Sequence, residues 1–77
     1  MGQDDGQLGR TVAGFAVLLA TATEMVRAGA KPALLDAYDD ASDQIIAGLR
    51  GDGIPDEQVQ SIHKALARLR LALEEKK

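Results

Sequence analysis

Residues 11–23 read TVAGFAVLLATAT and form the longest run of the chain without a charged side chain. Around this uncharged stretch, apolar residues recur at spacings of 4, 3, 4, 3 and 4, the repeat of a helix that packs along one side. The six positions are Leu8, Val12, Phe15, Leu19, Ala22 and Val26. Leu18 and Met25 lie beside this seam, and Gly29 is suited to end the helix. The sequence predicts a first helix over about residues 8–29.

Two further helices follow, and glycine and proline mark their limits. Pro32 is favoured in a first helical turn, and an apolar stripe predicts a helix over 32–50: Leu34, Tyr38, Ala41, Ile45 and Leu49. Gly51-Asp52-Gly53 is a strong break. A last seam predicts a helix over 55–75: Val59, Ile62, Leu66, Leu69 and Leu73. Short connections make neighbouring helices antiparallel. We therefore expect an all-α fold, either an up-down-up bundle or a helical hairpin with an associating helix.

The size of the chain favours association. Its 77 residues allow one domain, which we place at 8–77 after a disordered tail over 1–7. A chain this short buries only about 60% of its unfolded surface. Cysteine is absent, so disulfides cannot compensate. Small domains without such cross-links rely on well-packed helices or on oligomerisation, and we expect a homodimer or a higher homo-oligomer.

Composition argues against several functions. The net charge is −3, and Phe15 and Tyr38 are the only aromatic residues, which disfavours nucleic-acid binding through phosphates or base stacking. His63 is the only histidine, so we expect no metal site and no cofactor. Ser61 lies two residues from His63, and such side chains diverge on a helix. No nucleophile with an activating base can be assembled, and the chain is predicted not to be an enzyme.

The amino-terminal region does not fit a targeting signal. Residues 12–20 resemble the apolar core of a signal peptide, but Asp4 and Asp5 precede them where positive charge is expected. The uncharged stretch is also shorter than the ~20 apolar residues of a membrane span. We predict a cytoplasmic protein without a membrane partner. Whether residues 1–22 are ever processed is left open.

The uncharged stretch has more apolar surface than two neighbouring helices can cover. We expect its Phe15 and Leu19 side to close the bundle, and its Ala16 and Ala20 side to contact a second copy or a partner. Leu71 lies opposite the third seam and suggests a further packing surface. The candidate interface residues are Val12, Phe15, Ala16, Leu19, Ala20 and Leu71.

A polar docking face is predicted on the second helix, where four aspartates fall within a narrow arc: Asp36, Asp39, Asp40 and Asp43. They could receive a basic partner. Alternatively, they could be paired with the third helix, because opposite positions in an antiparallel hairpin turning near residue 52 sum to about 105. Asp40 would then lie level with Lys64, and Asp36 with Arg68 or Arg70. Exposed pairs of this kind contribute only about 0–1 kcal/mol each.

Three functions remain open. The first is a non-enzymatic interaction module of the adaptor, co-chaperone or inhibitor type, which self-associates and binds or masks a partner protein. The second is an oligomeric protein that sequesters a small molecule or nucleotide in an anion pocket lined by Tyr38, Lys64, Arg68 and Arg70. The third is a DNA-binding regulator using the basic residues of the last helix, although the acidic balance of the chain disfavours it.

Overall fold

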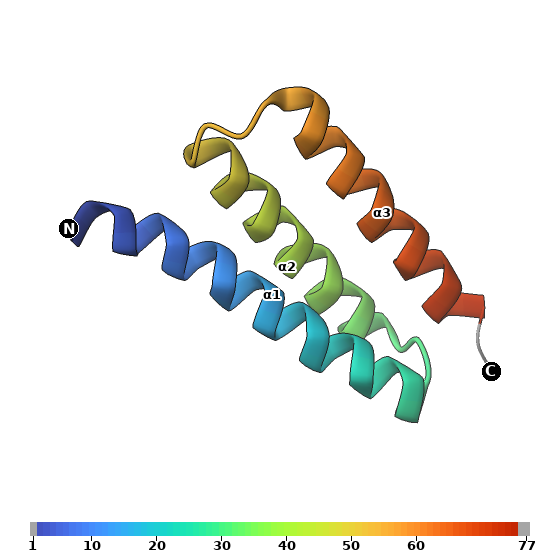
Figure 1. The fold of residues 1–77 in the computed structure, drawn as a ribbon. Helices are drawn as coiled ribbons and strands as arrows, with labels where there is room; N and C mark the ends of the chain where they lie inside the picture. Colours follow the sequence, from blue (N-terminus) through green and yellow to red (C-terminus); the bar gives the residue numbers. More distant parts are fainter. Residues whose placement is uncertain (1, 76–77) are drawn as a thin grey trace.

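The computed structural model describes residues 2–75, with side chains from residue 9 onward, and these residues form three α-helices (Figure 1). They are α1 (Gly2–Ala28), α2 (Pro32–Gly51) and α3 (Asp56–Glu75). Each helix runs back along the preceding one (Figure 1). The all-α class and the three predicted helices are confirmed. α1 begins at Gly2 rather than near residue 8; the disordered tail over 1–7 concerns order in solution and stays a prediction.

Glycines end α1 and α2 as the sequence predicts. Gly29 has φ +96° and donates its N–H to the Met25 carbonyl at 2.9 Å. Gly53 has φ +81°, and its N–H donates to the Arg50 carbonyl at 3.1 Å. The next N–H, of Ile54, donates to the Leu49 carbonyl at 3.1 Å. These two nested bonds are those of a Schellman motif, which satisfies the last carbonyls of a helix.

The three helices form an open layer with α2 in the middle (Figure 1). α1 packs extensively on α2, α3 packs on α2 more lightly, and α1 and α3 touch least. The Cα atoms extend over 43 × 25 × 14 Å, so the molecule is thin in one direction. Because α1 is covered mainly on its α2 side, a large part of its circumference is left at the surface.

The core is centred on α2. The largest fully buried side chains are Tyr38, Met25, Ile45 and Val59. The predicted α2 stripe is confirmed, since Tyr38, Ala41 and Ile45 are buried and the two end leucines pack against them. The predicted α3 seam is confirmed at Val59, Leu66 and Leu73 and partly at Ile62. Leu69, the remaining member of that seam, is exposed.

The predicted packing side of α1 is wrong. The residues that α1 buries lie one position away from the predicted seam and follow their own 3-4-3-4 spacing: Thr11, Gly14, Leu18, Thr21 and Met25. Phe15 and Leu19, expected to close the bundle, are exposed. Leu18 and Met25 take that role in the core.

Two glycines account for this choice of side. A Cβ on Gly14 would lie 2.9 Å from Ile45 Cγ1, and a Cβ on Gly48 would lie 2.1 Å from Thr11 Oγ1. Both distances are too short for real contacts. The two helices therefore approach so closely that only glycine, which has no Cβ, fits at these two positions. Close packing multiplies dispersion contacts along the crossing. The bulkier Phe15 side would hold the helices further apart.

Candidate functional site

Four large apolar side chains lie exposed in a row along α1, and we call them the outward stripe. Val12 is 58% exposed, Phe15 41%, Leu19 64% and Val26 51%. Their spacing places them on one side of α1, next to the side that packs on α2. The positions that would complete the repeat are Leu8, whose side chain lies outside the described residues, and Ala22, which is partly buried against the core.

The other predicted interface residues of α1 border this stripe. Ala16 and Ala20 are exposed, and no charged residue lies between positions 11 and 23. All five candidates from α1 are therefore accessible on one helix, and their role in an interface stays a prediction. Leu71 is also exposed, at 56%, but it lies on α3 two positions before buried Leu73. Residues two apart face opposite sides of a helix, so Leu71 points away from the core and is not brought to the stripe.

Leu69 of α3 is a surface residue that the sequence did not identify as such, because its spacing fits the buried seam. It is 41% exposed and lies at one edge of that seam. Arg70 lies at the opposite edge and contacts Asp39, which by helical spacing lies on the other side of α2 from Ala41 and Gly48, the residues that meet α1. By helical geometry Leu69 therefore lies at the α1 side of α3.

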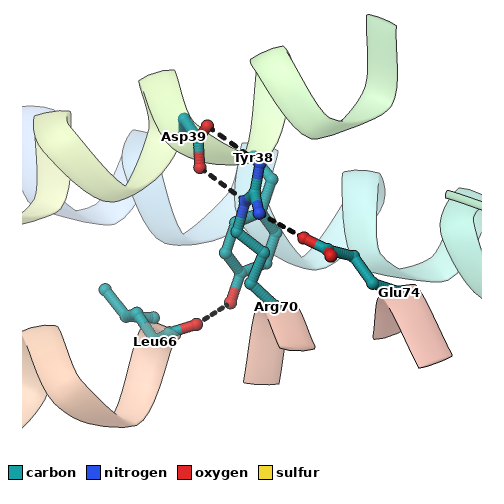
Figure 2. A network of polar contacts seen from close by, with 5 residues as sticks. All are labelled: Tyr38, Asp39, Leu66, Arg70 and Glu74. Carbon is teal, nitrogen blue, oxygen red and sulfur yellow. Dashed lines mark hydrogen bonds and ion pairs between the residues drawn. The ribbon is translucent and has the colours of Figure 1, made fainter. Parts of the chain in front are cut away.

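A polar network joins α2 and α3 (Figure 2). The Tyr38 hydroxyl donates to the Leu66 carbonyl at 2.7 Å. Arg70 Nε lies 2.8 Å from Asp39 Oδ1, and its Nη2 donates to Asp39 Oδ2 at 3.2 Å. Arg70 also pairs with Glu74, one turn further along α3. The network fixes the register of α3 on α2 with one buried hydroxyl and one shared guanidinium.

α3 forms an ion pair with the docking face at one position, Asp39. Positions 38 and 66 meet at a sum of 104, close to the predicted register. Arg70 pairs with Asp39, however, and not with Asp36 as one predicted pairing had it. Asp36, Asp40 and Asp43 are exposed, and within residues 9–75 they make no ion pair. Three of the four carboxylates thus remain open to a basic partner.

A pocket of about 310 Å³ lies beside this network. Its lining comes from α2 and α3 alone: Tyr38, Asp39, Ser42, Asp43, His63, Leu66, Ala67 and Arg70. Two members of the predicted anion pocket, Tyr38 and Arg70, are present here, whereas Lys64 and Arg68 are exposed outside the lining. Arg70 is already engaged by two carboxylates, and two carboxylates line the pocket. This arrangement disfavours an anion.

Burial raises the pKa of the Tyr38 hydroxyl above its ordinary value of 10.0; the Arg70 charge lowers it and Asp39 raises it, both less than burial does. The unfolded chain therefore loses this proton at lower pH than the folded protein. Stability from the protonated hydroxyl is complete below pH 10 and is lost as the pH rises through the folded-state pKa. Tyr38→Phe should remove this loss of stability at alkaline pH. At neutral pH it should lower the free energy of unfolding by about 1 kcal/mol, because the buried hydrogen bond disappears.

Urea unfolding followed by circular dichroism, at neutral pH and above pH 10, measures both effects. Tyr38 is the only tyrosine, so an absorbance titration reports its ionisation directly. Ionisation at or below the ordinary pKa would contradict the burial of this hydroxyl.

Two further features bear on function. Within the described residues, no three His, Cys, Asp or Glu side chains are placed to hold a metal ion. By length and composition, one helical segment of the described chain, Gly9–Ala28, could cross a membrane. Core helices and signal sequences pass the same test, so the absence of a membrane partner and the cytoplasmic location stay predictions.

Comparison with protein families, characterised proteins and solved structures finds no match to this chain. The outward stripe and the three open aspartates are therefore the features from which function is argued.

Proposed function

We propose that this protein is a non-enzymatic interaction module that self-associates through the outward stripe of α1 and binds or masks a partner protein. The observation that supports the proposal most directly is the exposure of Val12, Phe15, Leu19 and Val26 in a row. The neighbouring side of the same helix already packs on α2. α1 is thus apolar on two sides, and its own fold uses one.

Exposed apolar residues need an explanation only when they are contiguous. Single ones are common on protein surfaces, whereas contiguous patches mark interaction sites. The outward stripe is contiguous, and its spacing is the one by which helices interdigitate side chains. A helix with such a repeat is suited to pack against another helix.

The docking face supplies the second half of the proposal. Asp36, Asp40 and Asp43 are exposed on α2 and make no ion pair within the described residues. Carboxylates gathered on one face attract a basic surface, steer its approach and contribute more to association rate than to affinity. Self-association through α1 leaves this face accessible, so one assembly could hold two copies and a basic partner together.

Self-association is tested by Leu19→Asp, with Leu71→Asp as the matched control. Both leucines are exposed to a similar degree, at 64% and 56%, but only Leu19 belongs to the outward stripe. We expect the wild-type protein to sediment as a dimer or larger species at micromolar concentration. Leu19→Asp should sediment as a folded monomer, because a charge in an apolar interface is left unpaired.

Leu71→Asp should keep the wild-type mass. A wild-type protein that is strictly monomeric would overturn self-association. Loss of association in Leu71→Asp but not in Leu19→Asp would instead place the interface on the outer side of α3.

A further inference from the structure

We infer that two copies pair through their outward stripes in antiparallel orientation, and that Leu69 of α3 borders the contact. The inference rests on the proposed self-association and adds its geometry. It follows from the order of large and small side chains along α1, from the area that a stable dimer needs and from the distribution of charge.

The order of side-chain sizes favours antiparallel pairing. In a parallel pair each residue meets its own copy, so Phe15 would face Phe15 and Ala22 would face Ala22. One layer would be overfilled and another nearly empty, although both lie between the same two helices. In an antiparallel pair centred at residue 17, Phe15 faces Leu19 and Val12 faces Ala22 of the second copy. The two Phe15 rings then lie in different layers and Val12 fills the space opposite Ala22, so the layers are more evenly filled, as well-packed interfaces require.

The exposed apolar area of the stripe is too small for a stable dimer unless Leu69 of α3 also contributes. A large apolar side chain carries on the order of 100 Å² of transferable apolar surface, and the four stripe residues are about half exposed, so they offer roughly 200 Å² per copy. Stable interfaces bury about 600 Å² or more per partner, a little over half of it apolar. The stripe alone falls short. Leu69, 41% exposed at the α1 side of α3, and the exposed alanines beside the stripe supply more apolar area.

The charges of α1 agree with this orientation. No charged residue between positions 11 and 23 would be buried by the pairing. Arg10 and Glu24, which border the uncharged run, lie on the side of α1 away from the stripe, so the pairing leaves both charges in solvent. The helix dipoles also oppose each other favourably in the antiparallel pair.

Single cysteines test the orientation, and the chain has no native cysteine to interfere. Val12→Cys and Ala22→Cys are oxidised separately and as an equal mixture in a glutathione buffer, and intact mass identifies each disulfide. In the antiparallel pair, position 12 lies opposite position 22 of the other copy. Two positions 12 are then about 15 Å apart along the axis, too far for a disulfide. We expect a covalent dimer of mixed composition from the mixture and none from either variant alone.

The other outcomes are distinguishable. Disulfides in each variant alone indicate parallel pairing and overturn the inference while self-association stands. A wild-type dimer that gives no disulfide in any sample shows that the stripe is not the contact. A wild-type monomer removes the proposed self-association itself.

Leu69→Ala tests the contribution of α3. Its dissociation constant for the dimer should rise about tenfold, measured by sedimentation equilibrium. Leu71→Ala, on the outer side of the same helix, should leave the constant unchanged; equal effects of both variants would exclude Leu69 from the contact.

Discussion

Leu18→Asp should unfold the protein, whereas Leu19→Asp should leave its helices intact. Leu18 is 3% exposed in the core between α1 and α2, and Leu19 is 64% exposed in the outward stripe. An aspartate at position 18 must bury a charge without a partner or hold its carboxyl protonated, and either costs several kcal/mol. A domain of 77 residues has about 4–12 kcal/mol of total stability, so this loss is decisive.

Circular dichroism and urea unfolding over a range of protein concentrations measure this difference. The concentration series matters because Leu19→Asp also removes the proposed self-association, which stabilises the wild-type protein by mass action. Stability of Leu19→Asp should therefore be independent of concentration. Unfolding by Leu19→Asp with little effect of Leu18→Asp would show that α1 packs by the side predicted from the sequence.

The sequence placed the helices well because their limits depend on local chemistry. Gly29 and Gly53 adopt positive φ, which favours glycine, and Pro32 opens α2 where its missing N–H is tolerated. α2 and α3 also carry charges at positions such as Asp39 and Lys64, which mark the outer side and leave only one possible seam. For these two helices the apolar pattern was sufficient except at Leu69, which is exposed.

The packing side of α1 could not be predicted in the same way. Between residues 11 and 23 no charge marks an outer side, and two neighbouring rows both follow helical spacing. The row with the larger side chains, including Phe15 and Leu19, has the stronger hydrophobic signal. The structure buries the row with Gly14 and Leu18 because close approach to α2 depends on the small residue. A glycine inside a helix costs about 1 kcal/mol relative to alanine, so Gly14 was the available signal for the crossing, although it was not used to predict it.

The candidate site residues of α1 differ in the same way from those of α2 and α3. The α1 candidates are accessible because the fold buries the neighbouring row; Phe15 and Leu19 belong to the seam that was expected to close the bundle. The α2 and α3 candidates depended on register, and a shift of a few positions moved the Arg70 contact from Asp36 to Asp39. Long flexible side chains reach several neighbours, so helical register alone does not decide which carboxylate an arginine binds.

Gly48→Ala should destabilise the protein although alanine is the better helix former. The added methyl would lie 2.1 Å from Thr11 Oγ1 and 3.3 Å from Thr11 Cβ, so α1 must move away from α2. Overpacking of this kind costs about 1–3 kcal/mol, more than the ~1 kcal/mol that helix propensity returns. The free energy of unfolding, from urea titration, should therefore fall.

Gly9→Ala is the matched control, because Gly9 is exposed on α1 and a Cβ there meets nothing within 4 Å. It should gain up to about 1 kcal/mol from helix propensity alone. Thr11→Ala added to Gly48→Ala removes the Oγ1 atom that the new methyl would meet, and it should recover part of the loss. Equal gains in Gly48→Ala and Gly9→Ala would mean that the two helices do not cross closely at Gly48. In that case the Phe15 row, with its larger side chains, would again be the better candidate for the α1–α2 contact.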